Sequence, residues 1–165
     1  MKFRWKQFSC FVLAVALLVS AFSQIPVKAG STVSCKSLCN TALKATGNSS
    51  KLKYMSSSSS DFGALSYSDR KKVKSIQYVF DTKEVYSLCV MEASNTSDAK
   101  ALASVLKNYK KRNCKSDYLS DYSSTEKKVF KNAVYGRKGN YVWYISMSSD
   151  KSKNKKGQTA LKKKL

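Results

Sequence analysis

The sequence predicts an α+β domain whose helices pack on one face of a four-stranded, mostly antiparallel sheet. Two observations predict this class. Two segments space their apolar residues every three or four positions, as one face of a helix requires, and four segments have strand character, with apolar side chains assigned alternately to two faces. These segments follow the order helix, two strands, helix, two strands, and consecutive strands usually pair with each other.

The first expected element is a helix over residues 34–45, SCKSLCNTALKA. Ser34 can cap its N-terminus, and Gly47 can end it in the left-handed conformation. Its apolar residues recur at i, i+3, i+4 and i+7 and therefore share one face: Cys35, Leu38, Cys39 and Ala42. Residues 48–60, NSSKLKYMSSSSS, are rich in serine and have no apolar period, which predicts a connector.

A hairpin is expected next, after a short helical turn near residues 68–73. Its strands are predicted at 74–80, KSIQYVF, and 84–92, EVYSLCVME, with the turn DTK between them. In the first strand, alternation places Ile76, Tyr78 and Phe80 on one face. In the second strand, both faces carry apolar side chains, with Tyr86, Leu88 and Val90 on one and Val85, Cys89 and Met91 on the other.

The second helix is predicted over residues 97–112, with Ser97 as its N-cap. Its apolar residues form one stripe: Leu102, Val105, Leu106 and Tyr109. A tyrosine- and serine-rich loop over residues 116–124 follows. A second hairpin is then expected, with strands near 130–135 and 140–147. In the latter, Tyr141, Trp143 and Ile145 share one face, and Val142 and Tyr144 share the other.

The turn of this second hairpin reads Gly136-Arg137-Lys138-Gly139, which has the form of the GXXG loop of KH domains. A KH loop joins two helices and clamps a nucleic-acid backbone. Both flanks here have strand character, so we predict a hairpin turn whose glycines supply positive φ angles. Arg137 and Lys138 are then exposed residues of the tip, and nucleic acid is not an expected partner.

The first 29 residues have the three parts of a secretory signal peptide. Lys2, Arg4 and Lys6 form the positive start, and residues 8–22 are apolar except for two serines. Cleavage is expected after Ala29, which gives an exported or envelope-associated protein. The alternative is an uncleaved membrane anchor, although the apolar run is shorter than the ~20 residues that span a bilayer.

Removal of residues 1–29 would leave 136 residues, which corresponds to one domain by length. Within it the sequence suggests an N-terminal helix with its connector (30–60), an α+β core (61–149) and a lysine-rich C-terminal tail (150–165). The tail has seven lysines and one acid, Asp150. It is therefore expected to be frayed, with at most a short terminal helix.

The formal net charge of the chain is +21, and loss of the four basic residues of the signal segment lowers it to +17. A charge of this size attracts anionic partners. For an exported protein, the expected partner is an anionic cell-envelope polymer or membrane surface, near which each Lys or Arg contributes about 1 kcal/mol. The candidate contact residues lie in the hairpin turn and the tail: Arg137, Lys138, Lys155, Lys156, Lys162, Lys163 and Lys164.

The chain contains no histidine, which excludes Ser-His-Asp and Cys-His catalysis and histidine-ligated zinc. It also has neither a P-loop nor a GxGxxG motif, so no cofactor and no metal site are predicted. Four carboxylates fall in expected loops and turns, where helix capping is their ordinary role: Asp61, Asp69, Asp117 and Asp121.

Four cysteines follow the signal segment: Cys35, Cys39, Cys89 and Cys114. An even number of cysteines in an exported protein is typical of disulfides. Cys35 and Cys39 are four positions apart on a helix, which separates their Cβ atoms by ~5–6 Å. A disulfide requires about 3.8 Å, so cross-pairs with Cys89 or Cys114 are the alternatives. The other interpretation is that these cysteines are small, buried apolar residues.

The stretch from about Ile76 to Met147 resembles exported proteins of low-GC Gram-positive bacteria that carry the domain of unknown function 4358. The segments that carry the resemblance are VYSLCVMEA (85–93), DAKALASVLKNYKKRN (98–113) and KNAVYGRKGNYVWYISM (131–147). The closing hairpin is the most specific of the three. The resemblance implies export behind a signal segment, and it implies no activity and no functional residues.

The sequence therefore predicts an exported, envelope-associated, non-catalytic binding or accessory module with a basic surface. Two alternatives stay open. One is an enzyme that acts on cell-envelope polymers through the loop carboxylates. The other is a secreted module that binds a peptide or protein at an exposed sheet edge.

Overall fold

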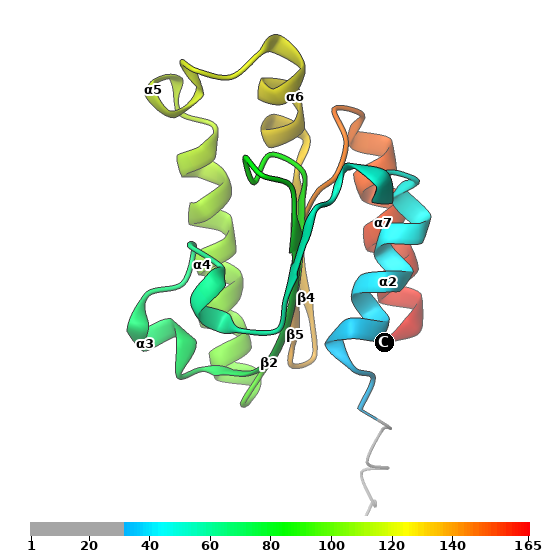
Figure 1. Cartoon of the computed structure of the whole chain (residues 1–165). Helices are drawn as coiled ribbons and strands as arrows, with labels where there is room; N and C mark the ends of the chain where they lie inside the picture. The colour runs from blue at the N-terminus through cyan, green and yellow to red at the C-terminus, as the bar shows by residue number, and fades with distance from the viewer. Residues whose placement is uncertain (1–31) are drawn as a thin grey trace, which may run out of the picture. The chain divides into compact units, whose positions relative to one another are not determined.

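A five-stranded antiparallel sheet forms the centre of the fold (Figure 1). The computed structural model describes residues 32–165, so the expected signal peptide and its cleavage site lie outside the described residues. The strands lie in the order β1-β2-β3-β5-β4 across the sheet. Their bounds are Tyr54–Ser56 for β1, Val73–Phe80 for β2, Ser87–Ala93 for β3, Val134–Lys138 for β4 and Tyr141–Ser146 for β5.

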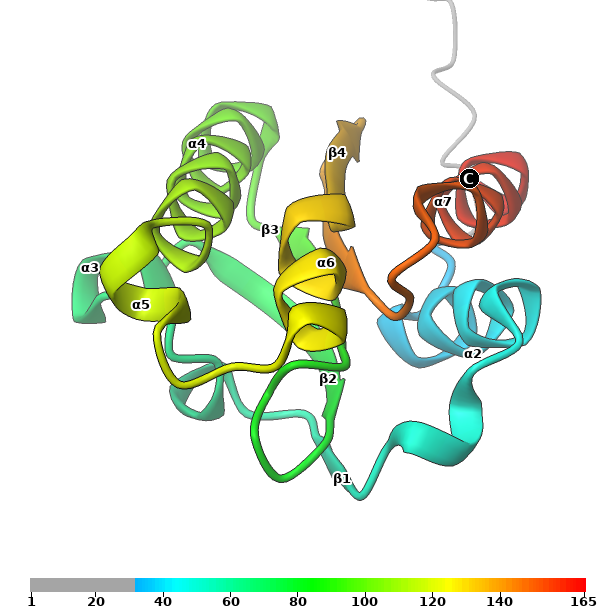
Figure 2. The same ribbon diagram turned by 90° about the horizontal axis from the view of Figure 1, so that it is seen from above.

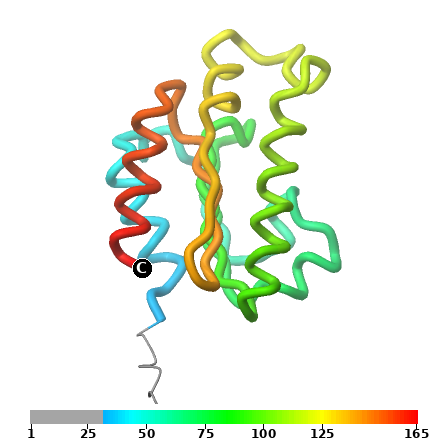
Figure 3. Tube along the Cα trace, turned by 180° about the vertical axis from the view of Figure 1, so that it is seen from behind, coloured from blue at the N-terminus to red at the C-terminus, as the bar shows by residue number. Residues whose placement is uncertain are grey.

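Helices cover both faces of this sheet. On one face lie α2 (Cys35–Thr46) and α7 (Lys151–Lys164), and on the other lies α4 (Thr96–Asn113), as the view from above shows (Figure 2). The view from behind shows the same three layers (Figure 3). The shorter helices are α3 (Tyr67–Arg70), α5 (Ser116–Leu119) and α6 (Ser124–Asn132), and two 3-10 turns are η2 (Ser49–Lys51) and η3 (Ser59–Asp61).

The predicted α+β class and the antiparallel pairing are confirmed. The prediction of four strands with all helices on one face is wrong, because the sheet has five strands and helices on both faces. The physical reason is visible in β3, in which every residue except Glu92 is buried. A strand buried on both faces needs a covering layer on each side. Cys89 and Met91 pack toward α4, and Leu88 and Val90 pack toward α2 and α7.

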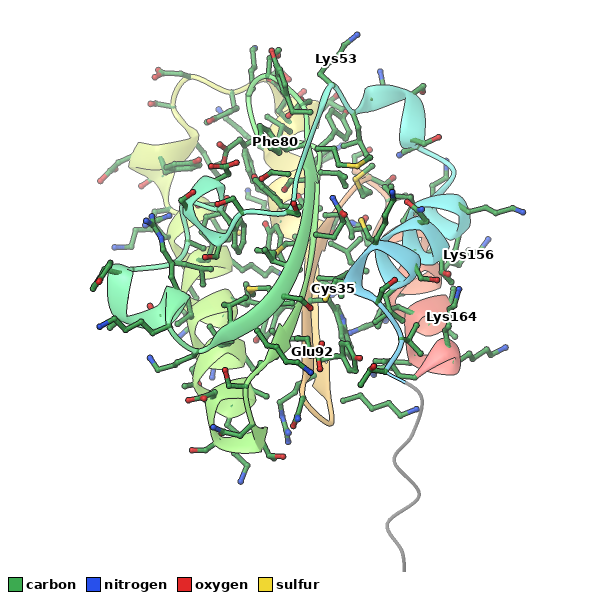
Figure 4. The ribbon with its side chains drawn as sticks, turned by 60° about the horizontal axis from the view of Figure 1, so that its bottom comes forward. Cys35, Lys53, Phe80, Glu92, Lys156 and Lys164 are labelled. Atoms are coloured by element: carbon green, nitrogen blue, oxygen red, sulfur yellow. The ribbon has the colours of Figure 1, made fainter. Side chains whose placement is uncertain are left out.

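The missing fifth strand, β1, lies within the serine-rich segment that the sequence predicts to be a connector. Its first residue, Tyr54, pairs with Phe80 of β2, and their ring centroids are 5.3 Å apart. The backbone N–H of Lys53 donates to the carbonyl oxygen of Phe80 at 3.0 Å, so both residues lie at this edge (Figure 4). A strand of three residues is too short to show an alternating pattern in the sequence.

The lysine-rich tail is a helix of 14 residues rather than a frayed end. Asp150 caps α7 by accepting a hydrogen bond from the backbone N–H of Ser152 at 2.7 Å. Asn154 is fully buried, and its side chain accepts from the N–H of Met147 and donates to the carbonyl of Asn132, both at 2.9 Å. These long-range contacts hold the helix in place, and no local sequence pattern indicates them.

Several element boundaries differ from the prediction. The first helix does begin after Ser34, whose hydroxyl accepts from Ser37 N–H, and Gly47 does end it at φ 71°. The second helix is capped by Asn95 rather than Ser97. The segment 130–135 does not form a strand throughout, because the capped helix α6 continues to Asn132 and β4 begins only at Val134.

The hairpin-turn interpretation of Gly136-Arg137-Lys138-Gly139 is confirmed for one glycine only. Gly139 has φ 56° and forms the turn. Gly136 does not have a positive φ; it lies in β4 opposite Trp143 of β5. A Cβ atom at position 136 would lie 2.7 Å from Cζ2 of Trp143, so this glycine makes room for the indole ring.

We expect Arg137→Glu to leave the fold intact, because Arg137 is exposed and its Nη1 donates only locally, to the carbonyl of Gly139 at 3.1 Å. The free energy of unfolding should change by less than about 0.5 kcal/mol. Far-UV circular dichroism and urea denaturation measure this. Gly139→Val is the comparison, expected to cost about 1–2 kcal/mol because of the left-handed backbone. Loss of the dichroism signal in Arg137→Glu would contradict the exposed position.

Within residues 32–165, every helix is too short or too polar to cross a membrane.

Candidate anion-binding surface

The helices α2 and α7 lie side by side and pack closely against each other (Figures 1 and 2). The contact depends on Gly157 of α7. A Cβ atom there would lie 2.7 Å from Cγ2 of Thr46 and 3.2 Å from the carbonyl oxygen of Ala42, both on α2. The absence of a side chain therefore allows the two backbones to approach, and Leu161 is buried one turn further along.

The solvent side of this helix pair carries lysine and almost no acid. α7 buries Asn154, Gly157 and Leu161, so its lysines all lie on the remaining surface. α2 contains no acidic residue, and Asp150 is the single acid from residue 150 to the end of the chain. The exposed lysines of the two helices are Lys36, Lys44, Lys151, Lys153, Lys155, Lys156, Lys162, Lys163 and Lys164.

The tip of the β4–β5 hairpin adjoins this surface. Nζ of Lys138 donates to the carbonyl oxygen of Lys162 at 3.0 Å, at the C-terminal end of α7. Nζ of Lys164 reaches back to Oγ1 of Thr41 on α2 at 3.2 Å. We call the nine exposed lysines of α2 and α7, together with Lys138, the basic face. Figure 4 shows Lys156 and Lys164 along α7.

Six of the seven sequence-predicted contact residues belong to the basic face, although they come from two separate segments. Arg137 does not, because it pairs with Val142 of β5, which packs on the α4 side of the sheet. The sequence missed Lys36 and Lys44, because nothing local indicates that α2 lies beside α7. It also missed Lys151 and Lys153, which belong to the face only because the tail is helical as far back as residue 151.

The charges of the basic face are not compensated by ion pairs within the described residues. Residues 32–165 contain three salt bridges, and each lies outside the basic face: Lys72–Asp69, Lys74–Glu92 and Lys83–Glu126. The nearest acid along the chain, Asp150, is engaged as a helix cap, and its hydrogen bonds from Ser152 hold its pKa below the usual value. Asp150 therefore stays ionised beside Lys153 and Lys156 and offsets one charge, while the net field of the basic face remains strongly positive.

The loop carboxylates of the alternative enzyme interpretation are spread over different parts of the fold. Asp69 forms a capping box with Ser66 at the start of α3, and Asp61 accepts a hydrogen bond from Ser56 at 2.6 Å. Asp117 and Asp121 are exposed and line an open hollow of about 510 Å³ with Lys83, Tyr118 and Tyr122. The structure thus brings two of the four together and gives the other two structural roles.

The four cysteines are free thiols, and the sheet separates them. Cys35 and Cys39 pack between α2 and the sheet, whereas Cys89 points to the α4 side. Cys35 lies 3.2 Å from the hydroxyl of Ser75, and Figure 4 shows it close to Glu92. Burial raises the pKa of Cys39 to about 12 and also raises that of Cys89, so these side chains behave as apolar residues and not as nucleophiles.

We expect one thiol to react quickly with Ellman's reagent in the folded protein, because Cys114 is partly exposed while Cys35, Cys39 and Cys89 are buried. The Cys114→Ser variant should lose this fast phase. In denaturant without reductant, all four should react. A denatured count of two or none, which rises on reduction, would show disulfides instead.

We also expect the free energy of unfolding to be nearly constant between about pH 5 and 8, because the chain has no histidine. On the acid side, hydrogen bonds from Ser123 lower the pKa of Glu126, as those from Ser152 lower that of Asp150. Such carboxylates stabilise the fold at pH values above their pKa in the unfolded chain. This contribution to the free energy of unfolding is lost as the pH falls through their pKa in the folded protein.

On the alkaline side, burial raises the pKa of Cys39, so its contribution is complete below the unfolded thiol pKa and is lost at higher pH. Urea denaturation from pH 3 to 10 in the presence of reductant measures the profile. A step in stability centred between pH 6 and 7 would be inconsistent with this assignment.

Comparison with protein-family models, with curated proteins and with solved structures gave no match. The resemblance to proteins with the domain of unknown function 4358 therefore stays a prediction from the sequence.

Proposed function

We propose that this protein is an exported, non-catalytic module that binds an anionic polymer or membrane surface of the cell envelope through its basic face. The observation that carries this proposal is the collection of ten cations on one side of the sheet, nine on α2 and α7 and one at the adjoining hairpin tip, none of them in a salt bridge with a described residue. Export itself rests on the signal peptide predicted from the sequence.

The number of cations exceeds what the fold requires. Lysines in the last turn of α7 are favoured by the helix dipole, which amounts to about half a negative charge at that end. The three positive charges of Lys162, Lys163 and Lys164 already exceed this half charge, and α2 and α7 carry six further exposed lysines. Near an anionic surface each cation contributes about 1 kcal/mol, so several acting together give substantial binding without a deep pocket.

The test compares two variants of equal net charge. One replaces Lys155, Lys156, Lys163 and Lys164 by glutamine, on the basic face. The control replaces four exposed lysines of α4 and α6 by glutamine: Lys100, Lys107, Lys128 and Lys131. Binding is measured by sedimentation with phosphatidylglycerol-containing vesicles and by titration with inorganic polyphosphate, which distinguishes a lipid surface from a polymer.

We expect the basic-face variant to bind at least tenfold more weakly than the control variant at low salt. Binding of the parent protein should weaken steeply toward physiological ionic strength. An equal loss in both variants would mean that net charge alone drives binding. Binding to neutral phosphatidylcholine vesicles as tight as that to anionic ones would exclude an electrostatic mechanism.

A second candidate function is peptide binding at the edge strand β1. This strand lies at the outside of the sheet, and its side chains Tyr54 and Met55 are 52% and 63% exposed. An extended peptide can add a strand to such an edge. The short length of β1 limits the backbone hydrogen bonds available, which is why we place this function second. Slowed hydrogen exchange of β1 amides in the presence of an envelope extract would favour it.

A further inference from the structure

A second basic site lies on the opposite side of the sheet from the basic face, beside the C-terminal half of α4. It is a hollow of about 390 Å³. Its lining combines an apolar wall with polar and cationic groups: Ala64, Val105, Asn108, Tyr109, Lys111, Arg112 and Lys115. The hollow is lined mainly by α4, together with Ala64, which precedes α3, so it can enclose part of a small ligand.

The guanidinium of Arg112 packs against the ring of Tyr109, which is itself held in place. Its Cζ lies 5.2 Å from the ring centroid of Tyr109, in a cation–π arrangement. Tyr109 itself is held by edge-to-face contacts with Phe62 at 5.3 Å and with Tyr144 at 5.2 Å, and it is only 7% exposed. An arginine that rests on a rigid ring loses less freedom when it binds an anion than a lysine in solvent does.

The charge of the hollow is unbalanced. Lys111, Arg112 and Lys115 contribute three positive charges, and none of them forms a salt bridge with any residue from 32 to 165. The C-terminus of α4 supplies about half a negative charge through the helix dipole, which leaves a clear excess. Most cations of this chain are lysines, but the hollow contains an arginine. Its planar guanidinium can donate two parallel hydrogen bonds to phosphate oxygens.

We propose that this hollow binds the phosphate group of a small organic phosphate monoester. Arg112 holds two phosphate oxygens with its fork, and Lys111 and Lys115 neutralise the remaining charge. The side chains of Ala64 and Val105 contact the apolar part of the ligand, and the amide of Asn108 is available for a polar substituent. The site is independent of the basic face, because the two lie on opposite sides of the sheet.

The test uses phenyl phosphate and inorganic phosphate as probes, with ¹H–¹⁵N NMR titration of the purified protein at 150 mM salt. We expect the shifts to concentrate on residues 105–115 and on Ala64. Phenyl phosphate should bind several-fold more tightly than inorganic phosphate, because only the former reaches the apolar wall. Arg112→Gln should weaken phenyl phosphate binding at least tenfold, and Arg112→Lys should restore only part of it.

Lys107→Gln is the matched control, because it removes one exposed positive charge from the same helix outside the hollow; its binding should stay within twofold of the parent. The NMR spectrum of each variant reports separately on folding. Equal weakening by Arg112→Gln and Lys107→Gln, or shifts distributed over the lysines of the whole surface, would overturn the site. Equal affinity for phenyl phosphate and inorganic phosphate would contradict the proposed contact between Ala64, Val105 and an apolar part of the ligand.

Discussion

Replacing Trp143 by alanine is expected to lower the free energy of unfolding by about 3–5 kcal/mol. Trp143 is the largest fully buried side chain, and it lies in β5 between Val90 of β3 and Gly136 of β4. Its ring packs on the side of the sheet that α2 and α7 cover. Loss of the indole leaves a cavity under both helices, which urea or thermal denaturation will measure.

Tyr67→Ala is the control for this prediction, because it removes an aromatic ring that is 75% exposed. Its ring contacts Nζ of Lys71 at 4.8 Å from the centroid, and an exposed contact of this kind is worth about 0.5–1 kcal/mol. If Trp143→Ala cost no more than Tyr67→Ala, the burial of the indole described above would be wrong.

A double-mutant cycle with Gly136 sharpens the test. Gly136→Ala alone is expected to cost about 1–3 kcal/mol, because its Cβ would overlap the indole of Trp143. In the Trp143→Ala background the ring is absent, so the same substitution should cost clearly less. Additive effects of the two changes would show that position 136 and the ring do not contact each other.

Gly157→Leu is expected to lower the free energy of unfolding by about 1–3 kcal/mol, and by more if α7 separates from the fold. Even a Cβ atom at position 157 would lie within 3.2 Å of the backbone of α2 and closer still to Thr46. The helix propensity of leucine exceeds that of glycine by just under 1 kcal/mol, which is too little to offset the overlap. Denaturation curves and hydrogen exchange of α7 measure the effect.

Gly63→Leu is the matched control for Gly157→Leu. Gly63 has no atom within 4 Å of an added Cβ and does not have a positive φ, so we expect a change within about 0.5 kcal/mol. Gly157→Leu should also weaken binding to anionic vesicles, since it displaces the helix that carries most of the basic face. Unchanged stability in Gly157→Leu would show that α7 does not pack on α2 as described.

The parts of the fold that the sequence predicts are those whose signals are local. The helix α2 has an N-cap, an apolar stripe and a C-terminal glycine within 14 residues, so its limits are correct to within one residue. Strands β2 and β5 are rich in β-branched and aromatic residues, β3 is a nearly continuous apolar run, and both hairpins connect as expected. The i, i+4 spacing also excludes a bond between Cys35 and Cys39, whereas the sequence left pairs with Cys89 or Cys114 open.

The parts that the sequence did not predict depend on distant partners. The helix α7 has no apolar stripe because its contact side is made by Asn154, Gly157 and Leu161, whose partners lie on α2, β5 and the end of α6. The strand β1 is ordered by pairing with β2 and not by its own composition. The sequence showed apolar residues on both faces of β3 and predicted both α2 and α4, but it did not show that these helices cover opposite faces.

The same distinction applies to the candidate surface. The sequence by itself determined that the protein carries a large positive charge, that it lacks histidine, and that its last segment is rich in lysine. Only the tertiary structure decided that this segment is a helix beside α2 and that the hairpin tip adjoins it. The physical reason is that charge and local propensity belong to single residues and short segments, whereas a binding surface depends on which segments the packed core brings together.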